Sequence, residues 1–414
     1  MKICLFGGTF DPIHKGHIHI AKNALSEFKL DKVIFVPTGN SYMKKDVSPA
    51  IHRLNMLKIA LKDFPEFEIS DIEIKREGYT YTRDTIKEIK EIYPDAEIYF
   101  LIGTDTLFMI EKWVEPEYLF NNLIFIVADR KDKNSKEKAK ELKDKFNADI
   151  RFSNCDFYDI SSSDIRSKIR ELGYSEFAFE MKKASECKED KENVSFSYGY
   201  VIESVFDYIK DNHLYIDLSD AEMITLLSKD LKESRLIHTL GVMDEASVLA
   251  KVYNADIKKV SLAALLHDCA KYMPMDESIE ICERNFVKLN DLERKKSSLL
   301  HSKAGACLAY EKYGIKDKEI LDAISYHTTG RPDMSIIEKI IFISDAIEPN
   351  RDYSEKLPMY RMIANVDIDL VCMNILKDTL DHLNSMEEKQ EIDIKTIETY
   401  EYYKTLISDR DKKK

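Results

Sequence analysis

The sequence lacks long hydrophobic runs. No stretch of its 414 residues approaches the roughly 18 uninterrupted apolar residues that a membrane-spanning helix needs. Its first residues, MKICLFGGTF, reach a glycine pair too soon to form the apolar core of a signal peptide. We therefore expect a cytoplasmic protein with no membrane partner.

Cysteine is sparse and follows no recognised pattern. Seven cysteines are scattered along the chain, and none forms a CxxC pair. An odd, dispersed set argues against a disulfide framework and against a zinc ribbon. The pattern predicts a reduced protein.

Positive charge is in deficit. The chain has 62 Lys and Arg against 75 Asp and Glu, a net charge of −13. Proteins that wrap nucleic acid usually carry the opposite sign, so no nucleic-acid partner is expected. Local basic pockets for phosphates remain compatible with this balance.

Length and composition indicate a globular protein of several domains. A domain usually takes about 100–200 residues, so 414 residues predict two or three. Hydrophobic residues make up 44% of the chain and charged residues 33%, a composition too apolar for a disordered chain. The composition leaves a homo-oligomer open.

The first half alternates strand-like and helix-like segments. Four short apolar runs, at 3–6, 33–36, 98–102 and 123–127, end near glycine, proline or aspartate. Such runs with helical stretches between them predict an α/β domain with a parallel sheet over residues 1–216. Ligands bind beyond the carboxyl ends of such strands, where Gly7, Gly39, Gly103 and Asp129 stand.

The second half has no comparable strand runs. Leu262, Leu265 and Leu266 share one helical face, as do Ile336, Ile340 and Ile343. This periodicity predicts an all-helical domain over residues 217–414. Before it, the polar segment 185–197 is expected to form a surface loop.

A glycine-rich segment with two histidines follows the first strand. It reads GGTFDPIHKGH over residues 7–17. Two glycines let the backbone approach an anion, and a helix starting near Gly16 would direct its amides at the same place. His14 and His17, three residues apart, can face one ligand, although a capping histidine at a strand–helix corner is the alternative.

This segment resembles the signature of the nicotinate-nucleotide adenylyltransferases. Further stretches agree in order and spacing: YTRDT at 81–85, GTD at 103–105 with Trp113, VADR at 127–130, and ISSSDIR at 160–166. The resemblance covers about residues 1–215. It implies a Rossmann-like nucleotidyltransferase that moves AMP from ATP to nicotinate mononucleotide, a step of NAD biosynthesis, with Mg²⁺ accompanying the ATP.

The resemblance also implies the roles of individual residues in this half. His14, His17 and Arg166 would be catalytic. The substrates would be bound by Gly7, Gly8, Thr9, Phe10, Lys44, Thr85, Gly103, Asp105, Trp113, Arg130, Ser162 and Ser163.

Several points in this half stay open. Lys45 is a rival to Lys44, because the loop after the second strand departs from the family pattern. Ser163 replaces a family threonine and keeps the hydroxyl. Trp113, the only tryptophan, either stacks on a pyridine ring or packs in the core. Nicotinamide mononucleotide, pantetheine phosphate and a sugar phosphate are alternative acceptors.

The second half places histidines and aspartates in a metal-ligand pattern. Six residues form it: His238, His267, Asp268, His301, His327 and Asp345. Imidazoles and carboxylates bind Mn, Fe, Co or Zn, and a bridging carboxylate such as Asp268 can hold two ions. His213 and His382 have no partners at meaningful spacing and are expected at the surface.

This pattern resembles the HD phosphohydrolases, and in detail the HD family of symmetrical diadenosine tetraphosphate hydrolases. LAALLHDCAKY at 262–272 and FISDAIEPNR at 342–351 carry the likeness, which covers about residues 225–400. It implies a site of two transition-metal ions, expected to be iron, held by the six residues above, and cleavage of diadenosine tetraphosphate to two ADP. Lys271 would be catalytic, and Arg331 and Arg351 would bind substrate phosphates. A non-catalytic nucleotide-sensing module is the alternative.

Overall fold

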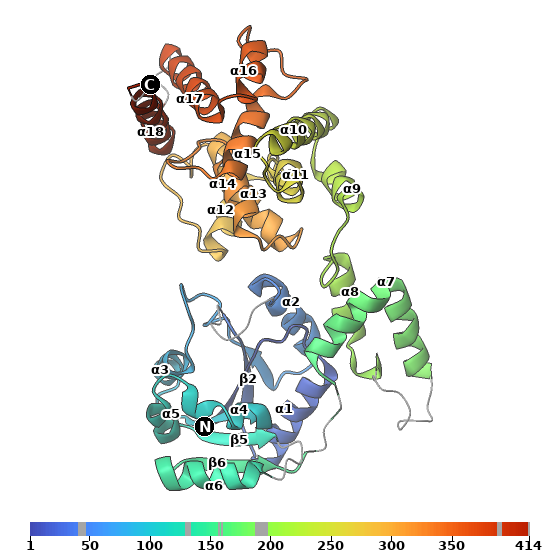
Figure 1. Ribbon diagram of the computed structural model, residues 1–414. Helices are drawn as coiled ribbons and strands as arrows, with labels where there is room; N and C mark the ends of the chain where they lie inside the picture. The colour runs from blue at the N-terminus through green and yellow to red at the C-terminus, as the bar shows by residue number, and fades with distance from the viewer. Residues whose placement is uncertain are drawn as a thin grey trace. The chain divides into compact units, whose positions relative to one another are not determined.

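A computed structural model describes residues 1–39, 47–128, 134–155, 158, 160–186, 198–386 and 391–412. The chain divides into two units, Met1–Ile216 and Asp217–Lys414 (Figure 1). Within the described ranges no helix has the length and apolar character to cross a membrane.

The first unit is built on a parallel six-stranded sheet in the order β3-β2-β1-β4-β5-β6. Its strands are β1 (Lys2–Gly8), β2 (Lys32–Pro37), β3 (Phe67–Ile69), β4 (Glu97–Gly103), β5 (Ile124–Ala128) and β6 (Asp149–Ser153). The strand order reverses between β1 and β4, which opens a crevice at their carboxyl ends, where such sheets bind ligands. The parallel, Rossmann-like sheet confirms the prediction.

Helices cover both faces of this sheet. The first unit contains α1 (Lys15–Glu27), α2 (Ala50–Leu61), α3 (Thr82–Ile92), α4 (Thr104–Leu107), η1 (Ile110–Lys112), α5 (Pro116–Asn122), α6 (Ser135–Phe146), α7 (Ser162–Glu186), η2 (Tyr198–Tyr200) and α8 (Glu203–Asp211). One apolar core lies between the sheet and α1, α2, α7 and α8, and a second lies between the sheet and α3, α5 and α6. The alternation of strand side chains supplies both: Cys4 and Phe6 face the first core, and Ile3 and Leu5 the second.

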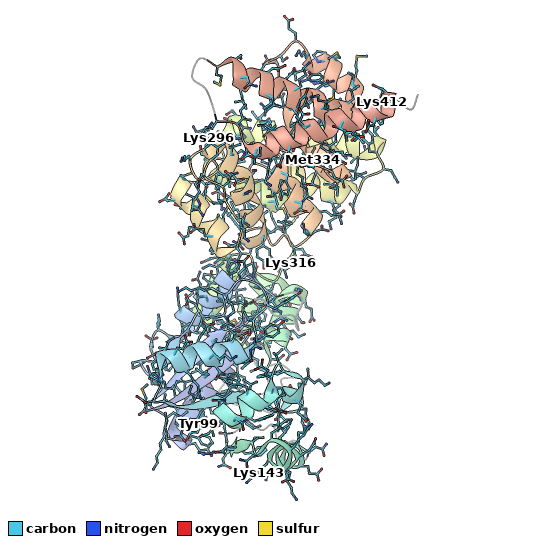
Figure 2. All side chains as sticks on the ribbon, turned by 90° about the vertical axis from the view of Figure 1, so that its left-hand side faces the viewer. Tyr99, Lys143, Lys296, Lys316, Met334 and Lys412 are labelled. Carbon is cyan, nitrogen blue, oxygen red and sulfur yellow. The ribbon has the colours of Figure 1, made fainter. Side chains whose placement is uncertain are left out.

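The described residues of the second unit form helices and the loops between them, as predicted. It contains α9 (Asp220–Asp230), α10 (Glu233–Val252), α11 (Ile257–Leu266), α12 (Met275–Arg284), α13 (Ser297–Glu311), α14 (Lys318–Tyr326), α15 (Ile336–Ile347), α16 (Leu357–Ala364), α17 (Ile368–Ser385) and α18 (Ile394–Asp411). The apolar helix α15 runs through its core, with Ile340, Ile341 and Ile343 fully buried. Each unit has a hydrophobic core of its own: Tyr99 belongs to the first unit and Met334 to the second (Figure 2).

Some predictions fall on residues that the structure does not describe. Lys44, its rival Lys45, Asp129 and Arg130 lie outside the described ranges. The predicted loop 185–197 is partly wrong, because α7 continues through Glu186; the remainder lies outside the described residues.

Candidate active sites

The two histidines of the glycine-rich segment lie together at the start of α1. His14 is the N-cap residue, and the ring centroids of His14 and His17 are 3.7 Å apart with 33° between their planes. The backbone amide of His14 donates to Nδ1 of His17 over 3.2 Å. Because Nδ1 accepts this hydrogen bond, the neutral ring of His17 carries its proton on Nε2. His17 is therefore held as a hydrogen-bond donor beside the positive end of the helix.

Two glycines leave room for the rings of His14 and Phe10. A Cβ at Gly16 would lie 2.9 Å from Nδ1 of His14, and one at Gly8 would lie 2.8 Å from the ring of Phe10. Phe10 itself has a φ of +51° and is 2% exposed, packed edge-on against Phe6. Its side chain therefore belongs to the core.

Asp11 anchors the loop to two distant segments. Its Oδ1 accepts from Tyr215 Oη over 2.8 Å, and its Oδ2 accepts from the amide of Ser48 over 2.9 Å. Burial and the adjacent Asp11 carboxylate raise the pKa of Tyr215 well above its usual value, so the phenol stays a donor. Arg53 adds a third contact, from Nη1 to the Thr9 carbonyl over 3.0 Å. Sequence reasoning did not place Tyr215 or Arg53 in the site, since their partners are far away along the chain.

The N-terminus of α7 joins the same loop. Ser162 Oγ donates to the Pro12 carbonyl over 2.8 Å, and Arg166 Nη1 donates to the Asp11 carbonyl over 2.6 Å. Ser163 lies beside Arg166, with 3.5 Å between its Oγ and Nη2. The structure thus brings predicted residues from two segments about 150 positions apart to one place. Two helix N-termini and a guanidinium gathered there suit a polyphosphate.

The residues predicted for the other substrate follow β4 and open α3. Gly103 ends β4 and caps α4, on which Asp105 is exposed. Trp113 is half-buried, edge-to-face with Phe100 at 6.1 Å between centroids. Thr85 is buried and donates to Glu73 Oε1 over 2.7 Å. Burial raises the pKa of Glu73, against the lowering effect of this hydrogen bond.

Six predicted ligands converge in the second unit from five helices. His238 lies on α10, His301 on α13 and Asp345 on α15, while His267 caps the end of α11 and His327 that of α14, with Asp268 directly after His267. Two overlapping groups each bring three ligand atoms within 4.8 Å of one another. The first comprises His238, His267 and Asp268, and the second comprises Asp268, His301 and His327.

The local backbone orients these imidazoles. Nδ1 of His267 lies 2.7 Å from the Ala264 carbonyl, and Nδ1 of His327 lies 2.7 Å from the Ile324 carbonyl. Both carbonyls are free because the helices end there. A carbonyl can only accept, so Nδ1 carries the proton and Nε2 offers its lone pair.

The donor set fits metal cations. Nε2 of His301 lies 3.1 Å from Nε2 of His327 and 3.1 Å from Asp268 Oδ1. With Nδ1 of His301 facing the Ser297 carbonyl at 3.2 Å, the two Nε2 lone pairs point at each other and at a carboxylate. Lys271 Nζ is a donor to this group, 3.4 Å from Asp268 Oδ1. Carboxylate and imidazole donors gathered in this way suit transition metals.

The protonation states of the cluster residues are those that metal binding requires. Burial lowers the pKa of His301 to about 4, so the ring is neutral at neutral pH and able to bind metal. Burial opposes ionisation of Asp268, but His267, His301 and His327 still hold its pKa well below the usual range. Burial also opposes ionisation of Asp345, but its hydrogen bond to His238 holds its pKa below the usual range.

Two residues around the cluster were not predicted as part of it. Glu348, 2% exposed, places Oε1 3.1 Å from Nδ1 of His238, whose Nε2 lies 3.0 Å from Asp345. Arg235 Nη1 donates to Asp268 Oδ2 over 2.8 Å. Their spacing carried a signal, because Arg235 and Glu348 each lie three positions, about one helical turn, from a predicted ligand.

Of the three basic residues predicted for the second site, two border the cluster and one does not. Lys271 Nζ lies 3.1 Å from Nε2 of His301, and Arg351 Nη2 donates to Asp345 Oδ1 over 2.9 Å, so both border the cluster. Arg331 instead pairs with Glu338 at 2.6 Å and with Asp322 at 3.1 Å.

Family models match both units. The cytidylyltransferase-like model matches residues 5–168, and the HD domain model matches residues 235–350.

Known proteins resemble either the whole chain or one unit. A Mycoplasma genitalium protein described as a probable nicotinate-nucleotide adenylyltransferase/Ap4A hydrolase is 32% identical over 84% of this chain and 88% of its own length. A probable nicotinate-nucleotide adenylyltransferase of Clostridium tetani is 39% identical over 41% of this chain and 87% of its own. The crystal structure of a predicted HD superfamily hydrolase involved in NAD metabolism, from Clostridium acetobutylicum, is 38% identical over 46% of this chain and 99% of its own, with a TM-score of 0.44.

Proposed function

The chain belongs to the family of nicotinate-nucleotide adenylyltransferase/Ap4A hydrolases, and from this membership we propose that each unit is an enzyme. The first unit transfers AMP from ATP to nicotinate mononucleotide, giving nicotinate adenine dinucleotide and pyrophosphate. The second hydrolyses diadenosine tetraphosphate to two ADP. Different observations support the two activities.

The paired His14 and His17 carry the first proposal. In adenylyl transfer the acceptor phosphate attacks the α-phosphorus of ATP in line, and pyrophosphate leaves, so positioning and charge stabilisation do most of the work. His17, with its proton on Nε2, donates to a phosphate oxygen as charge builds during the transfer. Ser162, Ser163 and Arg166 hold the triphosphate, with Mg²⁺ entering alongside ATP.

Nicotinate mononucleotide is the acceptor we propose. Trp113, half-buried at the carboxyl edge of the sheet, offers a ring for the pyridine to stack on. Gly103, Asp105 and Thr85 lie around the same strand end and the start of α3. The alternatives are nicotinamide mononucleotide and pantetheine phosphate.

Competing acceptors test this assignment. Purified protein is supplied with ATP, Mg²⁺ and one acceptor at a time, and pyrophosphate release is measured. We expect the highest kcat/KM with nicotinate mononucleotide. Preference for pantetheine phosphate would overturn the acceptor, and no transfer to any acceptor would overturn the reaction.

The convergence of His301, His327 and Asp268 carries the second proposal. Two cations held by the six ligands would activate a water molecule and offset the charge of the polyphosphate. Around them Lys271 and Arg351 orient the substrate phosphates, while Arg235 and Glu348 fix Asp268 and His238. We assign iron on the strength of the family resemblance.

Metal content and product analysis test the second proposal together. The purified protein is analysed for transition metals and assayed with diadenosine tetraphosphate. We expect two ions per chain and ADP as the sole product. A protein that holds no transition metal and stays inactive after iron, manganese or cobalt is added would instead be a nucleotide-sensing module.

A further inference from the structure

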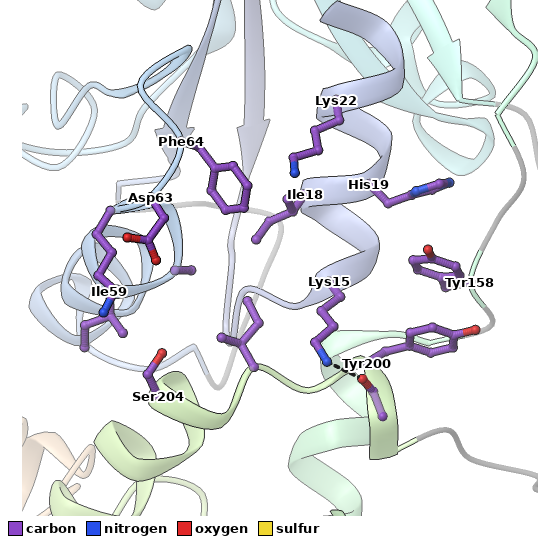
Figure 3. A pocket seen from close by; sticks show the side chains of 14 residues that line it. Lys15, Ile18, His19, Lys22, Ile59, Asp63, Phe64, Tyr158, Tyr200 and Ser204 are labelled. Carbon is purple, nitrogen blue, oxygen red and sulfur yellow. Dashed lines mark hydrogen bonds between the residues drawn. The ribbon is translucent and has the colours of Figure 1, made fainter. Parts of the chain in front are cut away.

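We propose that the first unit has a second ligand site, for an organic phosphate with a flat ring, in a cavity beside α1. The cavity has a volume of about 610 Å³ and lies between α1, the end of α2, Tyr158 and the segment from η2 to α8 (Figure 3). That volume falls in the range of small-molecule sites, roughly 300–1,000 Å³. The proposal is independent of the adenylyl transfer proposed above.

The cavity uses a different side of α1 from the paired histidines. Lys15, His19 and Lys22 line it at positions i, i+4 and i+7, which form one stripe of the helix. His17 is two positions from both Lys15 and His19, about 160° around the helix at 3.6 residues per turn. The site is therefore distinct from the glycine-rich loop of residues 7–14, which we call the phosphate loop.

Charge around the cavity selects an anion. Three lysines, Lys15, Lys22 and Lys62, line it together with His19, against one carboxylate, Asp63. This cluster stands out in a chain whose net charge is −13. Lys15 Nζ is fixed by a hydrogen bond to the Gly199 carbonyl over 2.6 Å and keeps two further donors. Lysine ammonium groups bind phosphate as point charges.

Aromatic rings in the lining select a flat body for the ligand. The rings of Tyr158 and Tyr200 stack at 4.1 Å with 15° between their planes, and His19 lies 4.5 Å from Tyr158 (Figure 3). Across the cavity the ring of Phe64 lies 4.1 Å from Lys22 Nζ. Ile18 and Ile59 add apolar surface beside it. Rings gathered with cations suit a planar, negatively charged molecule better than an aliphatic chain.

Pyridoxal 5′-phosphate is a direct probe, because it combines a phosphate, a flat ring and an aldehyde. The aldehyde condenses with a lysine amine, releasing water, and borohydride reduces the imine to a stable secondary amine. Peptide mapping then identifies each labelled lysine separately, so labels at Lys44, Lys45 or Lys271 are not confused with the cavity. We expect saturable labelling of Lys22 or Lys62 at one group per chain.

Competitors test the chemical class. Pyridoxine 5′-phosphate, which has no aldehyde, is expected to suppress this labelling, whereas pyridoxine without the phosphate is not. Labelling spread evenly over exposed lysines without saturation would overturn the site. Stronger suppression by decanoate than by pyridoxine 5′-phosphate would overturn the ligand class.

A pair of matched variants tests the residues. Equilibrium dialysis measures pyridoxine 5′-phosphate binding to the double variant Lys22→Ala with Lys62→Ala, and to Lys58→Ala with Lys140→Ala. The second pair removes two exposed lysines outside the cavity. We expect at least a tenfold loss of affinity in the first pair and less than a twofold change in the second. Equal losses of affinity in the two double variants, with thermal unfolding unchanged in both, would contradict the proposal.

Discussion

At the scale of single residues, both sites depend on which ring nitrogen of a histidine carries the proton. In His17 the backbone amide of His14 occupies Nδ1 and leaves the proton on Nε2, which makes a donor for phosphate. In His267 and His327 Nδ1 keeps its proton and donates it to a backbone carbonyl, which leaves the lone pair on Nε2, as a metal ligand requires. The same side chain thus serves two chemistries through opposite backbone partners.

Replacing His17 tests the donor role. His17→Ala should lower kcat for adenylyl transfer by about 10²–10³-fold, in line with the loss of one donor to developing charge in other enzymes. Steady-state kinetics with nicotinate mononucleotide measure it, and hydrolysis of diadenosine tetraphosphate by the same sample is the internal control. Full transferase activity in the variant would remove His17 from the reaction.

Metal stoichiometry tests the sharing of Asp268. This residue is common to both ligand groups, whereas His238 belongs to one and His327 to the other. His238→Ala and His327→Ala should each retain one ion per chain, and Asp268→Asn should retain none. The matched control His382→Ala removes an exposed histidine and should retain two. Two ions retained by Asp268→Asn would refute the bridging role.

At the scale of elements, helix ends position the chemistry. α1 and α7 begin at the phosphate loop, so the positive ends of their dipoles lie there, while α11 and α14 end at the candidate metal cluster and present carbonyls to His267 and His327. A phosphate-binding loop needs donors and a histidine ligand needs an acceptor. Each site therefore uses the helix end that suits it.

The hydrogen bond from Tyr215 to Asp11 ties the end of the first unit to its phosphate loop. Tyr215→Phe should lower kcat for adenylyl transfer and destabilise the unit by about 1–3 kcal/mol, because the buried carboxylate of Asp11 loses a partner. Thermal unfolding and kinetics measure the two effects.

Tyr174→Phe is the matched control for this prediction. Tyr174 donates to the neighbouring Leu214 carbonyl over 2.7 Å, so its loss should reduce stability but leave kcat unchanged. Equal kcat in both variants would mean that Tyr215 does not position the loop.

The sequence predicted the central strands and missed the edges. β1, β2, β4 and β5 are apolar runs because both faces of a parallel strand are buried. β3 and β6 lie at the sheet edges, and β6 is mostly half-buried, so DIRFS and FEI carry no apolar run. A short, polar edge strand is defined by its neighbour and not by its own pattern.

The site was predictable where chemistry follows spacing. The six candidate metal ligands and the paired histidines stand in patterns that metal and phosphate chemistry explain. Residues that act on those groups from afar were missed, because Glu348 and His238 are 110 positions apart and Tyr215 and Asp11 are 204 apart. Only the folded chain brings such pairs together.

At the scale of the whole molecule, each unit has its own core and its own site. Ile216 and Asp217 mark the division, and each candidate site is built from one unit alone. Fragments 1–216 and 217–414 should therefore each fold and keep kcat within about twofold of the full chain. Circular dichroism and separate assays measure this, and inactivity of a well-folded fragment would show that its site needs the other unit.

Removing the metal should affect one unit only. Chelation should lower the midpoint of thermal unfolding of fragment 217–414 by roughly 5–10 °C, since a ligand at a hundred times its Kd adds about 2.7 kcal/mol and 1 kcal/mol shifts the midpoint by about 2–4 °C. Fragment 1–216 is the control and should not change. An unchanged midpoint for both fragments would show that His301 and His327 do not need a cation.

The place of Tyr215 also matters during synthesis. It stands one residue before the end of the first unit, yet its hydroxyl anchors Asp11, near the beginning. In a nascent chain on the ribosome, Asp11 lacks this partner until almost the whole unit has emerged from the exit tunnel. The hydrogen bond that anchors Asp11 can therefore form only after the last residues of the first unit have been synthesised.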